Sequence, residues 1–258
     1  MGDWDSDLPN GDGIIYLPDT LLYEGSFAEG RPNGRGQVQF LNHKCVYEGD
    51  IANGQANGEG VFTNSQDKYT FRGQWQHSKP KTGRLDFATN GTIIEFEDYD
   101  KNLAKITYED HKVYHGQTDL KTFLPEGVGE VSFPDNSRYN GEFMAGKMHG
   151  KGVFQWRNAQ PGRCDEKYDG DYQYGKKHGN GKFTFSSGNV YDGQWVNGKR
   201  EGRGILVDKH GAEISNGVWF KGKILDSKQE DLNLNMEEHI INNGEQLEQK
   251  LESSGQKV

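Results

Sequence analysis

Glycine and aromatic residues alternate with polar residues through most of the chain, and one clear copy of the pattern begins at Tyr139. Tyr139, Gly141 and Phe143 share one parity, whereas Asn140 and Glu142 share the other. Because successive side chains of a strand point to opposite faces, this alternation predicts a β-strand with one aromatic face and one polar face.

A second segment with the same alternation follows each first segment after a short turn. Gly152, Phe154 and Trp156 share a face in one copy, and Gly181 and Phe183 do so in the next. Asn-Gly and Ser-Gly pairs between segments favour tight turns. The motif is therefore a predicted β-hairpin: Tyr-x-Gly-x-aromatic, two residues, Gly, three residues, Gly-x-Gly and a short apolar run.

This hairpin motif recurs at a nearly constant spacing. Tyr47 follows Tyr23 by 24 residues, and Phe71 follows after another 24. Such a period indicates a stacked array, because one hairpin cannot bury its aromatic face and a stack can. The glycines predict close packing and leave gaps in which a ring of the neighbouring hairpin can lie. We expect an all-β fold over residues 13–225, an elongated single-layer antiparallel sheet of stacked β-hairpins.

Two stretches of the array depart from the motif. Across residues 77–128 larger side chains, such as those of Lys101 and Lys105, replace most of the glycines. We expect a bend, a bulge or a specialised surface there. An insertion at residues 157–166 lengthens one turn and should protrude. Both stretches escape the constraint of stacking, so they are candidates for recognition.

The two ends of the chain are acidic. Residues 1–12 lack periodicity, and we expect them to be mobile. Residues 226–258 place Leu232, Met236 and Ile240 at helical spacing, which predicts a short C-terminal helical segment. This segment has two main interpretations, a cap for the last sheet edge or a partner-binding tail, and disorder is the third.

The composition fits an open array better than a two-layer domain, with 36 glycines in 258 residues and 32% hydrophobic residues. The net charge of −9 lies in the two ends and does not favour nucleic-acid binding. No long apolar run and no export signal are seen, so Cys45 and Cys164 are expected to be reduced thiols in the cytoplasm. Gly2 fits a loose N-myristoylation pattern, for which chance is the alternative interpretation.

The sequence shows no motif for catalysis, a cofactor or a metal. Each Gly-x-Gly precedes an apolar strand, whereas a phosphate loop needs a helix N-terminus after its glycines. His149 and His178 occupy equivalent places in successive hairpins, which a role in the turn explains better than metal ligation. We therefore expect no catalytic, cofactor-binding or metal site, and a protein that is not an enzyme.

The segment Tyr168–Tyr172, followed by Gly175 and Gly179-Asn180-Gly181, resembles the MORN repeat (membrane occupation and recognition nexus). The resemblance covers most of residues 13–225. It implies a groove-shaped β-sheet that acts as a binding platform. Free-standing arrays of this kind are similar to radial-spoke-head and other axonemal or cytoskeletal proteins.

The first functional hypothesis is a structural scaffold for protein–protein interaction in a cytoskeletal assembly such as the axoneme of a cilium or flagellum. Its partners would be other proteins of a larger complex or a second MORN protein. The tail would contribute Leu232, Met236 and Ile240, and the aromatic face would form the main binding surface. The aromatic candidates are Phe27, Trp75, Tyr139, Phe143, Trp156, Tyr168, Tyr172, Tyr191 and Trp195.

The alternative hypothesis is a peripheral membrane module that binds phosphoinositides. Basic residues recur on the turns of adjacent hairpins, but the body of the chain is neutral and its ends are acidic, which opposes binding to an anionic surface. The candidate lipid patch consists of Lys176, Lys177, Lys182, Lys199, Arg200 and Arg203.

Overall fold

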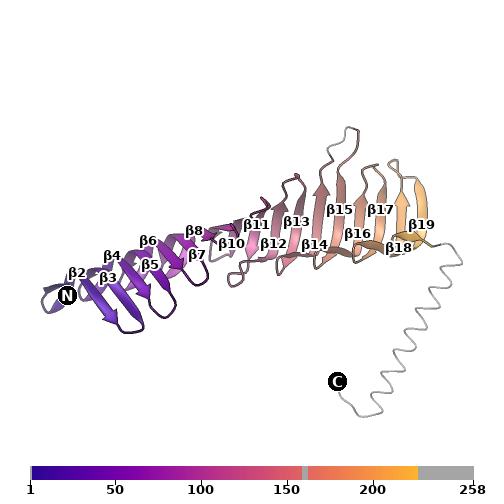
Figure 1. The fold of residues 1–258 in the computed structure, drawn as a ribbon. Coiled ribbons are helices and arrows are strands. Elements are labelled where there is room, and N and C mark those ends of the chain that lie inside the picture. The colour runs from indigo at the N-terminus through magenta and orange to yellow at the C-terminus, as the bar shows by residue number, and fades with distance from the viewer. Residues whose placement is uncertain (1, 159–161, 226–258) are drawn as a thin grey trace, which may run out of the picture. The chain divides into compact units, whose positions relative to one another are not determined.

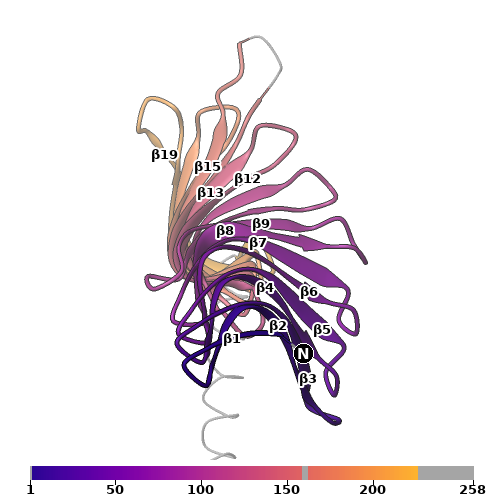
Figure 2. The ribbon, with the colours of Figure 1, turned by 90° about the vertical axis from the view of Figure 1, so that its left-hand side faces the viewer.

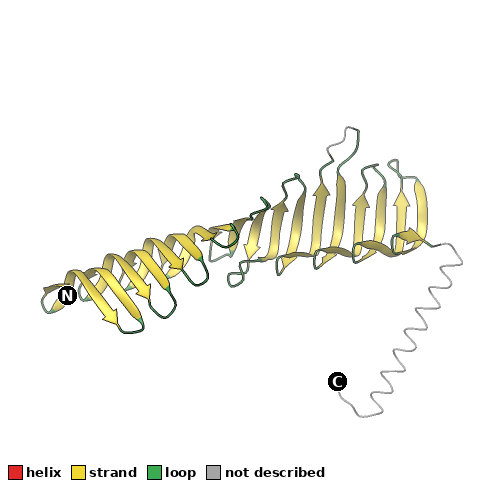
Figure 3. Ribbon diagram, viewed as in Figure 1, coloured by secondary structure: helices red, strands yellow, loops and turns green. Residues whose placement is uncertain are grey.

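The computed structural model describes residues 2–158 and 162–225, and every regular element within these ranges is a β-strand (Figures 1 and 3). The 20 strands of the described residues are assigned to one antiparallel sheet. The chain divides into two compact units, Met1–Phe154 and Gln155–Val258. The predicted all-β, single-layer antiparallel fold is confirmed.

In the first unit each strand pairs with its neighbour in sequence, as the registers from β1 to β13 show. Its strands are β1 (Gly2–Asp5), β2 (Leu8–Leu17), β3 (Leu21–Ala28), β4 (Arg31–Phe40), β5 (Cys45–Ala52), β6 (Gln55–Asn64), β7 (Tyr69–Gln76), β8 (Lys79–Phe87), β9 (Ile93–Asp98), β10 (Leu103–Thr107), β11 (Val113–Thr118), β12 (Pro125–Ser132), β13 (Arg138–Met144) and β14 (Lys147–Trp156), whose last two residues belong to the second unit.

The second unit continues the same neighbour-to-neighbour pairing. Its further strands are β15 (Glu166–Gln173), β16 (Lys176–Thr184), β17 (Val190–Val196), β18 (Lys199–Val207), β19 (Glu213–Phe220) and β20 (Lys223–Ile224).

Tight turns close the hairpins at the positions that the sequence predicts. Asn53 and Gly54 join β5 to β6 with φ angles of 51° and 76°, and Asn197 and Gly198 join β17 to β18 with 49° and 83°. Two successive residues with positive φ match the twist of the flanking strands, which explains the preference for Asn-Gly at these sites.

The paired glycines of each hairpin make room for a tyrosine ring. Gly170 on β15 lies opposite Gly181 on β16, and a Cβ atom on Gly170 would stand 2.8 Å from the hydroxyl oxygen of Tyr168. Tyr168 is fully buried and donates its hydroxyl to the carbonyl oxygen of Asp171 over 3.0 Å. The ring that covers the glycines thus belongs to the same hairpin, not to the neighbouring one as we expected.

A bulge next to these glycines has a polar cap that the sequence did not indicate. Gly179 has a φ angle of 58°, and the side chain of Asp171 accepts a hydrogen bond from the backbone N–H of Asn180 over 2.9 Å. Asp50 accepts the equivalent N–H of Glu59 over 3.0 Å. An acceptor directly after the glycine of the Tyr-x-Gly motif therefore satisfies a backbone donor that the bulge leaves unpaired.

The irregular stretch 77–128 remains a sheet, built from shorter strands. Strands were expected at residues 104–108 and 113–118, and β10 and β11 lie there. Ile94 and Phe96, which replace the Tyr-x-Gly pair, are buried at 1% and 4% exposure. Larger apolar side chains here fill the space that tyrosine and glycine fill elsewhere.

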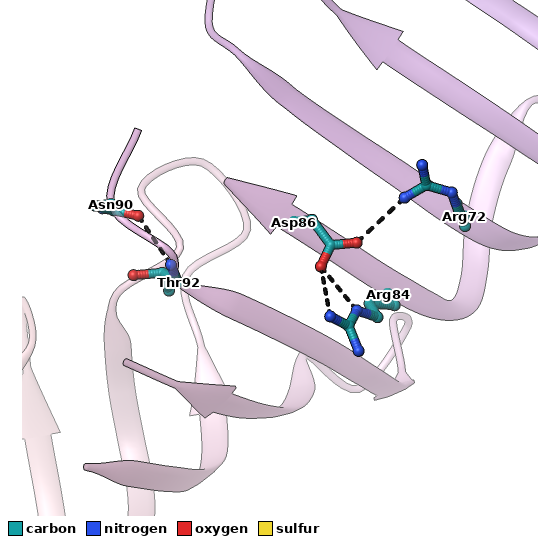
Figure 4. Close-up of polar contacts among 5 residues, drawn as sticks. All are labelled: Arg72, Arg84, Asp86, Asn90 and Thr92. Atoms are coloured by element: carbon teal, nitrogen blue, oxygen red, sulfur yellow. Dashed lines mark hydrogen bonds and ion pairs between the residues drawn. The ribbon is translucent and has the colours of Figure 1, made fainter. Parts of the chain in front are cut away.

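A small group of polar contacts lies on β7, β8 and the turn that follows (Figure 4). Asp86 on β8 accepts hydrogen bonds from Arg72 on β7 over 3.3 Å and from Nε of Arg84 over 2.8 Å. In the following turn, Asn90 accepts the backbone N–H of Thr92 over 3.1 Å. Ion pairs between exposed side chains contribute little to stability.

Residues 2–5 and 8–17 form β1 and β2, although residues 1–12 lack the periodicity of the array. Trp4 on β1 pairs with Pro9 on β2, and Asp12 accepts a hydrogen bond from the hydroxyl of Ser26 over 3.0 Å. Backbone pairing with an exposed strand edge does not require periodic side chains, which is why the pattern missed β1. The predicted C-terminal helical segment lies in residues 226–258, outside the described residues.

Candidate functional site

The aromatic residues of the second unit pack against one another edge to face. The ring centroids of Tyr168 and Tyr172 are 5.1 Å apart with an interplanar angle of 89°, and those of Tyr168 and Trp195 are 5.3 Å apart at 85°. Trp195 also donates its indole N–H to the carbonyl oxygen of Gly181 over 2.9 Å. These contacts fix each ring in place.

Most of the aromatic candidates are therefore core residues of the sheet. Trp75 and Trp156 are half-buried, and Trp75 lines the groove described next. The buried members of the set are Phe27, Tyr139, Phe143, Tyr168, Tyr172, Tyr191 and Trp195.

A groove of about 680 Å³ runs along the first unit. Figure 2 shows that the strands of this part of the sheet, β2 to β8, curve along their length. The groove is lined almost entirely by apolar side chains, with Ser78 as a polar exception. Its lining includes Ile15, Leu17, Leu21, Tyr23, Pro32, Val38, Phe40, Tyr47, Ile51, Ala56, Phe62, Tyr69, Phe71, Trp75, Pro80, Leu85, Phe96, Tyr99 and Phe123.

One position of the hairpin explains why a hollow remains beside the rings that line the groove. The first strand of each hairpin carries Tyr-x-Gly-x-aromatic, with an apolar residue in place of the aromatic one in some copies. The position in question comes five residues after that aromatic or apolar residue and lies opposite it on the second strand. Pro32 faces Phe27 and Ala56 faces Ile51 across the hairpin. Pro80 faces Trp75 in the same manner. Proline and alanine are too short to cover the neighbouring rings, so a hollow remains.

The same position holds a cation in the second unit. Lys177 faces Tyr172, and Arg200 faces Trp195. The Lys177 nitrogen lies 4.1 Å from the ring centroid of Phe183 and 4.6 Å from that of Trp195. The guanidinium of Arg200 lies 4.1 Å from the centroid of Trp219, so cation–π contacts fill the space that stays open in the first unit.

The charge of Lys177 is affected by these surroundings. Burial lowers the pKa of its ammonium group to about 8, and the carboxylate of Glu166 opposes this shift. Burial likewise lowers the pKa of Arg200, whose guanidinium donates a hydrogen bond to the carbonyl oxygen of Gly222 over 2.7 Å. Both cations are thus part of the packed aromatic face.

The six basic residues of the candidate lipid patch do not share one environment. Lys177 and Arg200 are half-buried over aromatic rings. Lys182 is exposed and forms an ion pair with Asp192 over 3.1 Å. The remaining three members, Lys176, Lys199 and Arg203, are exposed.

Histidine has a backbone role in the first and second units. The hydroxyl of Tyr139 lies 3.3 Å from the carbonyl oxygen of His149, and the hydroxyl of Tyr168 makes the same contact with His178.

Within the described residues, no cluster of three His, Cys, Asp or Glu side chains is placed to hold a metal ion. No helix in this part of the chain is long and apolar enough to cross a membrane.

Of two further recognition candidates, the turn is partly within the described residues and the tail is outside them. The turn 157–166 contains residues 159–161, which lie outside them, while Asp165 accepts the backbone N–H of Asn158 over 2.9 Å. Leu232, Met236 and Ile240 lie outside the described residues. The resemblance implied a groove, but sequence reasoning did not place it in the first unit; the signal for its place was a short Pro or Ala side chain, at Pro32, Ala56 and Pro80.

The sheet and its repeating hairpins define the class, a repeat protein whose units stack through an aromatic and glycine face. Five segments of the chain match the MORN repeat family, namely residues 23–43, 47–66, 139–159, 168–190 and 191–211. Three of the five matches, residues 23–43, 47–66 and 139–159, begin in the first unit.

Among curated proteins, the chain is similar to alsin. It is 31% identical to alsin of Rattus norvegicus over 159 residues and 30% identical to that of Homo sapiens. Each match covers 59% of this chain but only 9% of alsin, so the similarity concerns a small part of that protein.

Two solved structures show limited similarity. The TCP10 domain of Danio rerio CPAP, in complex with a peptide of STIL, is 18% identical, with 82% of this chain and 97% of that domain covered and a TM-score of 0.42. The SAS-4 TCP domain of Drosophila melanogaster, in complex with a proline-rich motif of Ana2, is 14% identical, with 60% and 82% covered and a TM-score of 0.37.

Proposed function

We propose that this chain is a non-enzymatic scaffold whose first unit binds another protein in its apolar groove. The observation that carries the proposal is the groove of about 680 Å³ with an almost wholly apolar lining. A concave and mainly apolar hollow of about 300–1,000 Å³ is typical of a binding site. The MORN repeats supply a rigid sheet on which the groove is fixed.

The shape of the groove fits a segment of polypeptide. It extends over successive strands, from Ile15 on β2 to Phe96 on β9. Leucine-sized side chains of an extended or helical segment would replace water over Tyr47, Phe62 and Trp75. Burial of such side chains stabilises a complex by about 25 cal/mol for each Å² of apolar surface removed from water, before the cost of association.

At a finer level, we propose a cytoplasmic protein of a cytoskeletal assembly, in particular the axoneme of a cilium or flagellum, with a role similar to that of radial-spoke-head proteins. The support is the family resemblance. The partner would be another component of that complex or a second MORN protein. Residues 226–258 are proposed as a second contact, through Leu232, Met236 and Ile240.

The test is affinity capture from ciliated cells with the wild-type chain and an Ala56→Arg variant. The arginine would fill the groove in the manner of Arg200, so we expect the main partner to be lost. Gln66→Arg on an exposed turn makes the same change of charge outside the groove and should retain the partner. Equal capture by wild type and Ala56→Arg would refute binding in the groove.

Two further measurements test the finer proposals. A chain of residues 1–225 that recovers every wild-type partner would refute the tail contact. Localisation of the tagged chain outside the axoneme would refute that assignment. Co-sedimentation with vesicles containing phosphatidylinositol bisphosphate tests the membrane alternative, and we expect none because the basic residues lie in separate environments.

A further inference from the structure

The groove contains four aromatic rings at the same repeat positions as the four rings that surround Lys177. Tyr47 corresponds to Tyr168, Phe62 to Phe183 and Trp75 to Trp195, each at the same place in its hairpin motif. Phe40 and Trp156 also correspond, since each follows the second glycine of its Gly-x-Gly by four residues. We call the first-unit set, Phe40, Tyr47, Phe62 and Trp75, the open ring box.

The two sets of rings have nearly the same geometry. The centroids of Tyr47 and Trp75 are 5.3 Å apart at 84°, compared with 5.3 Å and 85° for Tyr168 and Trp195. Phe62 lies 6.3 Å from Trp75 at 55°, and Phe183 lies 6.1 Å from Trp195 at 51°. Three of the four rings therefore have the same mutual arrangement in both places.

The indole groups are also held in the same way. Trp75 donates its N–H to the carbonyl oxygen of Gly60 over 3.2 Å, as Trp195 does to Gly181 over 2.9 Å. With the N–H directed at the backbone, the six-membered part and face of each indole remain for other contacts. The negative face of an aromatic ring attracts a cation.

The two boxes differ in the residue that reaches into them. Lys177 extends over its four rings, with its nitrogen 4.1 to 5.5 Å from their centroids. The corresponding residue of the open ring box is Ala56. Among the described residues, no lysine or arginine lies over Phe40, Tyr47, Phe62 or Trp75.

We propose that the open ring box binds a lysine or arginine side chain supplied by the partner protein, in the place that Lys177 occupies in the second unit. The inference rests on the proposed function, because the groove must receive a polypeptide for the cation to arrive. The partner is then an apolar segment that carries one basic residue. Arg200 over Tyr191 and Trp219 shows that the repeat accepts a guanidinium in the same role.

The arrangement gives the groove a means of selecting its partner. An apolar lining alone accepts any hydrophobic segment. A ring box favours a segment that carries a cation at the one position that reaches the rings. The cation–π contact strengthens as the cation loses water, which offsets part of the cost of burying the charge. The register of the bound segment would be set by this contact, as one specific pair sets the register of other repetitive interfaces.

The experiment is an NMR titration of the full-length protein labelled with ¹⁵N-tryptophan. The ligand is Nα-acetyl-lysine methylamide, and the corresponding norleucine compound is the neutral control. The indole N–H signals of Trp75 and Trp195 are followed separately. We expect Trp75 to shift and the lysine compound to bind roughly 3- to 30-fold more tightly than the norleucine compound. Trp195 should not shift, because Lys177 already fills its box.

Two variants reverse this pattern. Ala56→Lys should place the chain's own lysine in the open ring box and abolish the response of Trp75. Lys177→Ala should open the second box and make Trp195 respond to the lysine compound. Because Ala56→Lys copies a residue that the repeat already accommodates, its fold should be retained, which the unchanged remaining tryptophan signals would confirm.

Each other outcome overturns the inference. Equal responses to the lysine and norleucine compounds would show an apolar groove without a cation site. No shift of Trp75 at concentrations near 100 mM would show that the rings do not accept a cation. Neither result affects the capture experiment, so a failure of this inference is distinguishable from a failure of the proposed function.

Discussion

The ring of Trp195 stands edge-on to the ring of Tyr168, with 5.3 Å between their centroids, and its indole N–H is bound to Gly181. The two aromatic residues come from successive hairpins, so this contact joins one repeat to the next. Trp219 makes the same contact with Tyr191 at 5.2 Å. Stability of the array should depend on these inter-repeat rings.

Replacement of Trp195 by alanine should therefore be strongly destabilising. Trp195 is 4% exposed, and removal of a buried tryptophan costs about 3–5 kcal/mol. We expect the free energy of unfolding of the second unit to fall by this amount. Urea titration monitored by hydrogen exchange of β15 to β18 measures it. Trp4→Ala is the matched control because Trp4 is 66% exposed. Equal midpoints for the two variants would contradict the role of the rings.

A side chain at Gly170 should disturb the fold. Its Cβ would lie 2.8 Å from the Tyr168 hydroxyl oxygen and 2.6 Å from the carbonyl oxygen of Asn180. We expect Gly170→Val to lower the free energy of unfolding by about 1–3 kcal/mol or to prevent folding. Gly175→Asn is the control, since Gly175 has open space around it and asparagine tolerates its positive φ. Calorimetry of both variants tests the close contact.

The tyrosine hydroxyl contributes separately from its ring. In Tyr168→Phe the carbonyl oxygen of Asp171 loses a hydrogen bond of 3.0 Å, which costs about 0.5–1.5 kcal/mol. Phe71 occupies the same motif position, so the ring alone is compatible with the fold. Tyr16→Phe, at a residue 61% exposed, should leave the unfolding midpoint unchanged. A larger loss in Tyr16→Phe than in Tyr168→Phe would refute this assignment.

Lys177 should make stability depend on pH in alkaline solution. Burial lowers its pKa to about 8 from the ordinary value of 10.5, so between these values the unfolded chain holds a proton that the folded chain has released. The free energy of unfolding must then rise with pH above 8. The rings around the ammonium oppose part of this effect, which leaves a gain on the order of 1 kcal/mol.

The measurement compares urea unfolding of the wild type and Lys177→Met between pH 7.5 and 9.5. Subtraction of the variant removes the contributions of other groups, such as Tyr191, whose pKa is raised to about 12 mainly by burial. We expect the difference to favour the wild type increasingly as pH rises. A flat difference would show that Lys177 keeps its ordinary pKa in the folded chain.

The hairpins and their stacking could be predicted because they depend on short, repeated sequence patterns. Tyr168, Gly170 and Gly181 keep the same spacing in most copies, and strand alternation alone places them on one face. Alternation assigns the aromatic residues to one face of the sheet, but it does not say whether that face is exposed. Rings such as Tyr139 turn out to be wholly buried by neighbouring rings, which a face assignment does not show.

The place of the groove in the first unit could not be predicted from the motif residues, because the groove lies where side chains are short. Pro32, Ala56 and Pro80 carry no chemistry of their own, and their effect appears only when the cross-strand register is known. The capping role of Asp171 has the same origin, since it depends on a bulge between two strands. Both features follow from geometry between segments rather than from the pattern within one segment.

The pairing of each strand with its neighbour in sequence has a kinetic consequence. In the described residues, contacts within a hairpin join parts of the chain that are close in sequence. The two strands on either side of Asn53 and Gly54 are an example, so little loop-closure entropy is lost at each step. Proteins with such low contact order fold faster than other β-proteins of similar length. Folding can therefore begin at any complete hairpin and advance strand by strand in both directions along the chain.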